Sequence, residues 1–251
     1  MKKSVFGTAF LVLALTCGSA TAAGPAAAPY NWTGFYIGLN MGGTVNNSDY
    51  TLRPTGGFAG DPNNRLRTDS GNPGGGAYSI GGQLGYNYQI GRFVLGLETD
   101  FNSDGTDTSQ SVNRPLSSPL QGNIAHTVHQ NVDFFGTVRG RIGFTPRDRL
   151  LIYGTGGLAY GDVSSSSNVS FTAAGDTYAG SSSGMQAGWT AGAGTEYAFT
   201  DKWSVKLEYL YIDLGSRSST YNTQAPFAAY SYATDLDTTQ HVIRIGFNYK
   251  F

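Results

Sequence analysis

The feature that most constrains the fold is a recurrent alternation of apolar and polar side chains along most of the chain. Near the start of this pattern, Phe35, Ile37 and Leu39 alternate with Tyr36 and Gly38. A spacing of two places alternate side chains on opposite faces of a β-strand. After the first 23 residues there is no apolar run of about 18 residues, the length that a membrane-spanning helix requires. The chain is therefore predicted to be all-β.

Eight segments carry this alternation, and each is close to the roughly 9–11 residues with which a tilted strand crosses a bilayer. They are residues 35–42, 79–88, 93–101, 131–145, 150–161, 186–199, 202–214 and 239–251. An even number of such strands predicts an eight-stranded antiparallel transmembrane β-barrel. The mean hydropathy of -0.23 agrees with this fold, because a barrel wall mixes apolar and polar residues.

The connectors between these segments alternate in length. The short ones are residues 89–92, 146–148 and 200–201, and the long ones, rich in Gly, Ser, Asn and Thr, are residues 46–77, 103–129, 162–184 and 215–238. This asymmetry is typical of outer-membrane barrels, with short periplasmic turns and four long extracellular loops. A soluble eight-stranded lipid carrier is the alternative, but it usually lacks the asymmetry and hides its apolar face inside.

The N-terminus has the pattern of a secretory signal. Lys2 and Lys3 precede an apolar stretch over residues 5–15, and Ala20-Thr21-Ala22 is a small-residue cleavage site. We predict a signal peptide over residues 1–22 and an outer-membrane β-barrel domain over residues 23–251. Export by this signal would deliver the chain toward the bacterial outer membrane.

The composition narrows the chemistry available to the mature protein. Cys17 is the only cysteine and would leave with the signal, so no disulfide or thiolate-metal site is expected. A lipoprotein cysteine is the alternative for Cys17, but Thr16 and Ala14 match that pattern poorly. The net charge of -1 argues against a nucleic-acid partner, which requires a basic face.

Alternation also predicts which charged side chains face the barrel interior. They are four basic residues and four acidic ones: Arg139, Arg141, Lys206 and Arg244, with Glu98, Asp100, Glu196 and Glu208. An eight-stranded barrel is just wide enough for side chains to fill, so these charges must pair or suffer a large desolvation cost. We predict a lumen ion-pair network that acts as a structural plug. A gate on a narrow ion path is the alternative.

Aromatic residues cluster at the ends of the predicted strands near the short turns. Those predicted to form an aromatic girdle at the membrane interface are Trp32, Phe93, Phe144, Phe199 and Trp203, with Tyr30 and Phe251 nearby. Ordinary β-propensity is the alternative explanation. The chain ends with Phe247, Tyr249 and Phe251 on one face.

Other candidate sites are weak. His126 and His129 are three residues apart in a predicted loop, and they are the only candidates for binding a metal or hemin iron, although solvated histidines are the simpler interpretation. His241 lies near the outer end of the last strand. Gly154-Thr155-Gly156-Gly157 lacks the helix and lysine of a phosphate-binding loop. We identify no catalytic residues, no metal site and no cofactor, and predict that the chain is not an enzyme.

Several stretches resemble the small outer-membrane β-barrel proteins of alphaproteobacteria. This family includes the major outer-membrane proteins of about 25 to 31 kilodaltons, the related hemin-binding proteins and members that carry the porin family name. The resemblance is carried by segments such as 32–40, 81–87, 136–143, 153–161, 188–194, 206–215 and 242–251. It covers all eight predicted strands and none of the long loops. It also implies that Phe247, Tyr249 and Phe251 form the C-terminal signal for the outer-membrane insertion machinery.

The sequence therefore predicts an integral outer-membrane protein with a structural, envelope-integrity role that presents surface loops. A small porin for ions or small solutes is one alternative, and a surface binder of hemin or host molecules is another. The expected partners are outer-membrane lipids, the insertion machinery and periplasmic chaperones, with a host or hemin ligand possible at the loops.

Overall fold

A computed structural model describes residues 30–56, 59, 69–72, 74–115, 122–171, 176–222 and 230–251. The predicted signal peptide, residues 1–22, lies outside the described residues. Within the described part of the chain, no helix is long and apolar enough to span a membrane.

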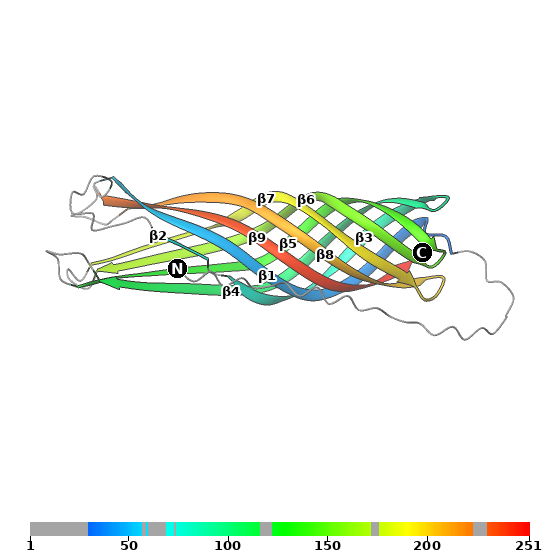
Figure 1. Ribbon diagram of the computed structural model, residues 1–251, viewed down its shortest axis with the longest axis horizontal. Coiled ribbons are helices and arrows are strands. Elements are labelled where there is room, and N and C mark those ends of the chain that lie inside the picture. The colour runs from blue at the N-terminus through cyan, green and yellow to red at the C-terminus, as the bar shows by residue number, and fades with distance from the viewer. Residues whose placement is uncertain are drawn as a thin grey trace.

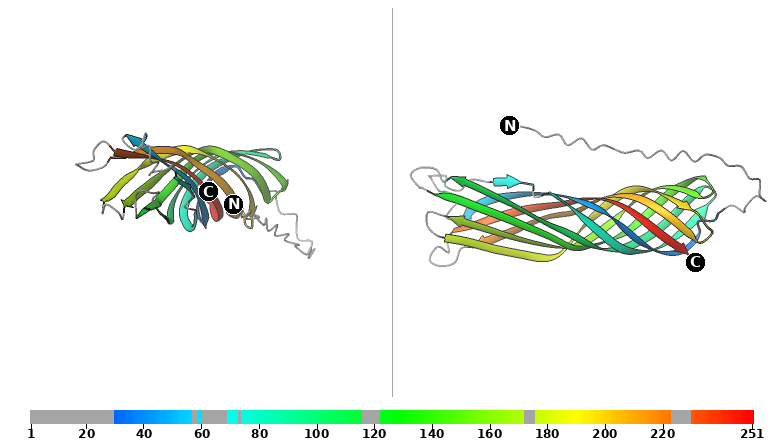
Figure 2. Two further views of the ribbon diagram at one scale, coloured as in Figure 1. Left: turned by 60° about the vertical axis from the view of Figure 1, so that its left-hand side comes forward. Right: turned by 90° about the horizontal axis from the view of Figure 1, so that it is seen from below.

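The described chain forms a ring of eight long antiparallel strands (Figures 1 and 2). The strands are β1 (Gly34–Gly56), β2 (Asp69–Gly71), β3 (Gly75–Ile90), β4 (Phe93–Pro115), β5 (Asn123–Arg147), β6 (Leu150–Phe171), β7 (Asp176–Ala198), β8 (Trp203–Asn222) and β9 (Tyr230–Lys250). Eight of these nine strands form the ring: β1 pairs with β3, each later strand pairs with the next, and β9 pairs with β1 to close it. The short β2 pairs only with β1. The predicted eight-stranded antiparallel barrel is confirmed.

The strands are much longer than the sequence predicted. Seven of them have 20 to 25 residues, about twice the length needed to cross a bilayer. Most of residues 46–77, 103–129, 162–184 and 215–238 therefore lie in strands, and their prediction as long loops is wrong in extent. The serine run 164–167 shows why: it pairs residue by residue with 180–183 of β7. Because these residues are small and polar, their sequence looks like that of a loop although their backbone is paired in the sheet.

The outward face divides the barrel into two halves. In the apolar half, which carries the short turns, large apolar side chains such as Leu39, Leu97 and Ile245 point outward and are about half exposed or more. In the polar half, outward positions hold residues such as Asp49, Ser109 and Asn131. The apolar half comprises residues 34–45, 78–101, 134–159, 185–212 and 242–251, and the polar half comprises the remaining strand residues.

Three β-bulges mark the junction between the halves. They lie between Ser103 and Thr106 in β4, Val132 and Phe134 in β5, and Asp213 and Ser216 in β8. The β8 bulge contains Gly215 at φ +76°, a conformation that favours glycine, and its N–H donates to the Asp213 carboxylate at 2.8 Å. Each bulge inserts residues into one strand, so the inward-facing set shifts from even to odd numbers along β5.

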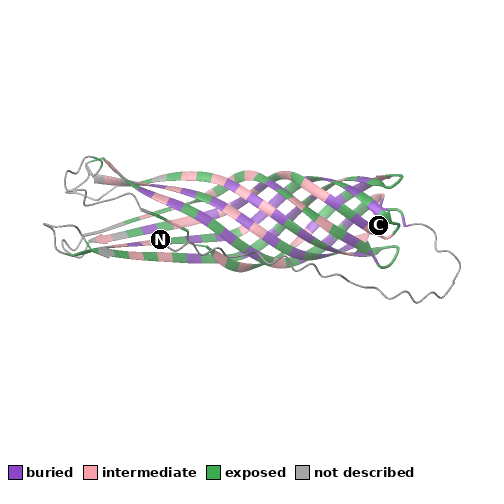
Figure 3. Ribbon diagram, viewed as in Figure 1, coloured by how far each residue is buried: buried purple, intermediate pink, exposed green. Residues whose placement is uncertain are grey.

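Buried side chains fill the lumen in layers, and burial alternates along every strand (Figure 3). One apolar cluster closes the short-turn mouth: Tyr30, Trp32, Val94, Leu151, Tyr153 and Ala198. A second lies at the junction: Val132, Phe135, Ala159, Val163, Leu210, Ile212, Leu214 and Val242. A third, of Tyr50, Val128 and Leu236, lies in the polar half.

Four of the five predicted girdle residues point outward. Phe93, Phe144, Phe199 and Trp203 are 40–58% exposed at the short-turn end of the apolar half. Trp32 does not belong to this set, because it is only 2% exposed and lies inside the mouth. It precedes β1, so strand alternation does not govern it. Its indole N–H donates to the carbonyl of Asp148 at 3.2 Å, which satisfies the buried donor.

Candidate functional site: the charged cluster of the lumen

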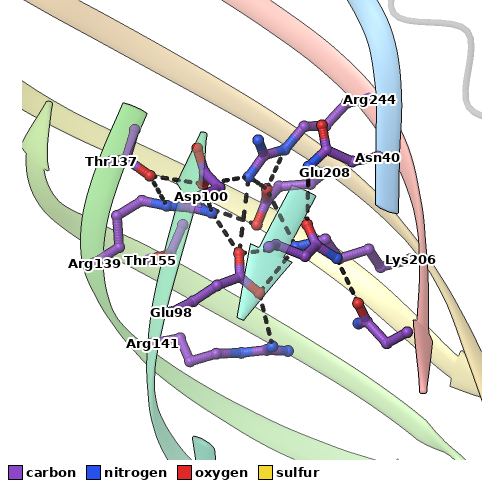
Figure 4. Close-up of polar contacts among 12 residues, drawn as sticks. Asn40, Glu98, Asp100, Thr137, Arg139, Arg141, Thr155, Lys206, Glu208 and Arg244 are labelled. Atoms are coloured by element: carbon purple, nitrogen blue, oxygen red, sulfur yellow. Dashed lines mark hydrogen bonds and ion pairs between the residues drawn. The ribbon is translucent and has the colours of Figure 1, made fainter. Parts of the chain in front are cut away.

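The eight inward charges predicted from the sequence all lie inside the apolar half, each 5% exposed or less. They come from five strands: Glu98 and Asp100 of β4, Arg139 and Arg141 of β5, Glu196 of β7, Lys206 and Glu208 of β8, and Arg244 of β9. Figure 4 shows how most of them meet across the lumen. We call these eight residues the charged cluster.

Arg139 is the centre of the cluster because its guanidinium contacts three carboxylates. Its Nη2 lies 2.5 Å from Glu98 Oε1 and 2.9 Å from Asp100 Oδ2, and its Nη1 lies 3.1 Å from Glu208 Oε1. The remaining donor, Nε, bonds to the hydroxyl of Thr137 at 2.8 Å. A planar fork with several donors suits such convergence better than a lysine ammonium does.

Arg244 and Lys206 supply the opposing positive charges from the other side of the ring. Arg244 Nη2 lies 2.6 Å from Glu208 Oε2 and 2.9 Å from Asp100 Oδ2. Lys206 Nζ donates to both oxygens of Glu98, at 2.8 and 2.9 Å. Each carboxylate at the centre therefore faces more than one cation, and the group is linked as a network rather than as separate pairs.

Arg141 and Glu196 form the lower arm of the cluster, toward the short turns. Arg141 Nη2 lies 2.8 Å from Glu196 Oε2, while Ser204 and Asn248 donate to the other oxygen of Glu196 at 2.6 and 2.8 Å. The Arg141 guanidinium also lies over the ring of Tyr153, 4.0 Å from its centroid. This stacking adds a cation–π attraction between two buried side chains.

Two tyrosines complete the network, and the sequence did not identify them as site residues. The Tyr36 hydroxyl donates to Glu98 Oε2 at 2.7 Å, and the Tyr153 hydroxyl donates to Glu208 Oε1 at 2.9 Å. Both are buried. Alternation already placed Tyr36 on the inward face of its strand, so a buried hydroxyl needing a partner was the available signal.

Inward glycines make room for the large side chains of the network. A Cβ added at Gly85 would overlap the ring of Tyr36, and one added at Gly194 would lie 2.6 Å from the hydroxyl oxygen of Tyr153. The lumen of an eight-stranded barrel is narrow, so a long side chain from one strand lies against the backbone of its neighbours. This close approach accounts for part of the glycine content.

The cluster has four positive and four negative groups in mutual contact, so it is neutral as a whole. Removing one partner would leave a charge buried without compensation, which typically costs about 3–5 kcal/mol. Each of the four carboxylates accepts at least one bond from a cationic donor. The arrangement can therefore hold the lumen closed by polar contacts that are satisfied only when the side chains converge.

The mouth below the cluster is closed by the segment before β1. Trp32 N–H donates to Gln89 Oε1 at 2.8 Å, and Tyr30 packs edge-on against the Trp32 ring with centroids 4.8 Å apart. Lys250 Nζ lies 4.2 Å from the Tyr30 ring centroid and donates to the carbonyl of Asn31. Burial raises the pKa of the Tyr30 hydroxyl to about 12, so it stays neutral at physiological pH.

The histidines are not arranged as the sequence suggested. His126 and His129 lie in β5 rather than in a loop, and because they are three residues apart their side chains point to opposite faces. His126 is buried, 2.9 Å from the Ser167 hydroxyl, whereas His129 is exposed. The two cannot bind one metal or hemin iron together. His241 lies in β9, with its Nδ1 2.7 Å from the Tyr209 hydroxyl.

No metal centre of histidine, cysteine or acidic residues is present in the described part of the chain. The three aromatic residues at the C-terminus, Phe247, Tyr249 and Phe251, follow one another on the outward side of the last strand. The rings of Tyr249 and Phe251 meet edge to face with centroids 5.4 Å apart, and Phe251 is 72% exposed.

Comparison with known proteins gives matches over nearly the whole chain. A family model described as outer membrane protein beta-barrel domain matches residues 10–251. The 31 kDa outer-membrane immunogenic protein of Brucella melitensis is 38% identical over 239 residues, covering 90% of this chain and 88% of that protein. The 22 kDa outer membrane protein of Rhizobium leguminosarum bv. viciae is 32% identical, covering 74% and 66%. Among solved structures, OprG from Pseudomonas aeruginosa aligns over 87% of this chain and 96% of its own, with 15% identity and a TM-score of 0.49.

Proposed function

Because the chain belongs to the outer membrane protein beta-barrel domain family, and is thus an integral protein of the bacterial outer membrane, we propose that it is a closed barrel with a structural role. In this proposal the apolar half anchors the protein in lipid, and the polar half projects from the membrane and presents the connectors between β1 and β3, β4 and β5, β6 and β7, and β8 and β9 at the cell surface.

The observation that carries the proposal is the charged cluster. A conducting pore needs a continuous polar path wide enough for water, whereas Arg139 alone joins three carboxylates from two facing strands. Apolar side chains around Trp32 lie below the cluster, and those around Phe135 lie above it. Three stacked layers favour a plugged lumen over the small-porin alternative.

The relatives support the surface part of the proposal. The Brucella proteins are named outer-membrane immunogenic proteins, and connectors presented at the cell surface would be accessible to antibodies. We propose that the connectors of this chain are presented in this way. The hemin-binding alternative gains no support from His126 and His129, because they point to opposite faces of β5.

We further propose that the protein is not an enzyme, that residues 1–22 direct its export, and that periplasmic chaperones and the insertion machinery handle it before assembly. The outward position of Phe247 and Phe251 in the final strand is consistent with an insertion signal there. The lipid partner is the outer membrane itself, which contacts the apolar half.

A cell-based experiment tests the structural role. Deletion of the protein should increase sensitivity to detergents and bile salts, and the wild-type chain should restore resistance without increasing uptake of a small sugar. A tag inserted between β8 and β9 should bind antibody on intact cells, and a tag in the turn at Gly91 should not. Complementation that depends on solute uptake would contradict the proposal and favour the porin.

A further inference from the structure

Asp104 is a buried carboxylate that does not belong to the charged cluster. It lies in β4 just above the cluster, at the junction of the two halves, and is 5% exposed. Among the described residues it has no ion-pair partner. Its oxygens accept only from neutral donors: Thr106 N–H at 3.1 Å, the Thr106 hydroxyl at 2.8 Å and Gln240 Nε2 at 3.1 Å.

The charge balance of the lumen makes this position unusual. The charged cluster is neutral, so Asp104 adds one uncompensated negative charge to the buried interior. The guanidinium groups of Arg139 and Arg244 bond to Asp100, four residues before Asp104. His126 faces the lumen eight residues farther along the paired strands, opposite Val112, and Arg217, opposite Leu236, donates to the carbonyl of Ser183. At about 3.3 Å per residue these groups are too far away to neutralise Asp104. An isolated buried carboxylate is costly unless a cation or a proton accompanies it.

Three oxygen atoms on inward side chains that neighbour Asp104 in the sheet or contact it are buried and have no hydrogen-bond partner among the described residues. They are Ser79 Oγ, Asn102 Oδ1 and Gln240 Oε1, on side chains that are at most 2% exposed. Ser79 is the β3 residue paired with Asp104, and Gln240 reaches Asp104 from β9. Asn102 is two residues before Asp104 on the same face; its Nδ2 donates to Asp100 Oδ1 at 2.7 Å, and its Oδ1 lies against Gly81 of β3, the strand that carries Ser79.

We propose that Asp104 binds a monovalent alkali cation, Na⁺ or K⁺, together with Ser79 Oγ, Asn102 Oδ1 and Gln240 Oε1. Carboxylate, hydroxyl and amide oxygens are ligands for hard cations, and the set contains no nitrogen or sulfur that would select a transition metal. One carboxylate balances one positive charge. A divalent ion would leave a net positive charge that this single carboxylate cannot balance.

The site would explain how a carboxylate is tolerated between apolar layers. The facing wall of β5, β6 and β8 contributes Phe135, Ala159 and Ile212 at the junction, so the polar atoms of β1, β3, β4 and β9 have few protein donors to meet. A bound cation would satisfy three acceptors and one charge at once. It would also tie β3, β4 and β9 together above the charged cluster.

The experiment compares thermal unfolding of the refolded mature barrel in detergent with NaCl, KCl or choline chloride at equal ionic strength. Ligand binding to the folded state raises the unfolding midpoint by mass action. We expect the midpoint to be about 2–4 °C higher in Na⁺ or K⁺ than in choline. Asp104→Asn should remove the difference, whereas Asp107→Asn, an outward neighbour that is 73% exposed, should keep it.

Two further measurements keep the proposal falsifiable. If Asp104→Asn does not fold, Ser79→Ala should reduce the alkali-ion effect and Ser103→Ala, its outward-facing control, should not. Crystals grown with thallium(I) should show anomalous density next to the Asp104 carboxylate. Equal midpoints in all three salts, or an alkali-ion effect that survives Asp104→Asn, would overturn the proposal and indicate that a proton neutralises this carboxylate.

Discussion

The apolar half and the polar half are continuous strands of one sheet, yet their inner and outer faces have opposite character. In the apolar half, Leu97 and Ile245 point outward while Arg139 and Glu208 point inward. In the polar half, serines and aspartates face outward, and neutral side chains such as Gln130 and Leu236 fill most of the lumen. In the proposed arrangement lipid surrounds the apolar half and water surrounds the polar half, so the alternation of apolar and polar side chains is reversed between inside and outside to suit each solvent.

The comparison teaches where stability originates in each half. Lipid removes the hydrophobic driving force from the outer face of the apolar half, so its inner contacts are polar and must be satisfied within the barrel. In the polar half, water surrounds the barrel, so burying apolar side chains in the lumen stabilises the folded state. The bulges in β4, β5 and β8 lie at the junction between the apolar half and the polar half.

The largest expected effect comes from breaking the charged cluster. Arg139→Ala should reduce the free energy of unfolding by about 3–5 kcal/mol, because three buried carboxylates lose a shared partner. Water entering the lumen would reduce this cost. The matched change Arg53→Ala removes a surface ion pair with Asp235 in the polar half and should cost about 1 kcal/mol or less. Urea unfolding in detergent measures both, and equal losses would contradict the distinction.

The second-largest effect is expected from a charge placed on the outer face, which should destabilise the apolar half more than the polar half. Leu97→Arg should destabilise the barrel by about 2–4 kcal/mol, because it exposes a cation to the lipid core. Ser109→Arg, on the outward face of the same strand, should change stability by about 0.5 kcal/mol or less. The measurement is refolding into lipid vesicles. If both variants insert equally well, the apolar half does not contact lipid.

Loss of the final residue should affect assembly more than stability. Deleting Phe251 removes one exposed aromatic ring and the hydrogen bond from its N–H to the carbonyl of Phe35, and leaves the paired residues of β9 with β1 and β8 in place. We expect a several-fold lower yield in the outer membrane of cells, with stability of the refolded chain reduced by only about 1 kcal/mol. Ile243→Leu, at an outward position of β9 outside the proposed signal, is the control. Equal losses in cells and in detergent would refute a signal role.

The smallest effect concerns proteolysis of intact cells, which should leave the barrel folded. Arg65 and Arg67 lie between β1 and β2, outside the described residues, and are predicted trypsin sites because surface connectors are cleaved preferentially. Arg92 and Arg147, at the short turns, should be protected. Fragment masses identify the cleaved bonds. Cleavage confined to Arg92 or Arg147 would mean that the barrel has the opposite orientation.

The sequence predicted the wall of the apolar half well because its alternation is between unlike residues. It could not predict the strand ends in the polar half, where serine, threonine and asparagine occupy outward positions as they would in a loop. The same error hid Asp104, because this residue falls within a predicted connector. It also placed His126 and His129 in a loop, although strand geometry separates their side chains.

The partners of the charged side chains in the lumen could not be predicted from one sequence, for a different reason. Alternation gives the face of Glu98 or Arg139 but not which partner it meets, since that depends on strand stagger and on the reach of long side chains across the lumen. Tyr36 likewise contacts Glu98 only through the hydroxyl at the end of its long side chain. Trp32 lies before β1, where no alternation applies, and packing in the mouth decided its position.

The measurement that tests the central claim most directly is single-channel recording of the refolded wild-type barrel in a planar bilayer. A lumen closed by the mouth, the charged cluster and the junction layer should conduct rarely and in small steps. Arg139→Ala, which removes the central guanidinium, should open more often. A wild-type barrel that opens readily to a steady, large conductance would contradict the plugged lumen and identify a porin.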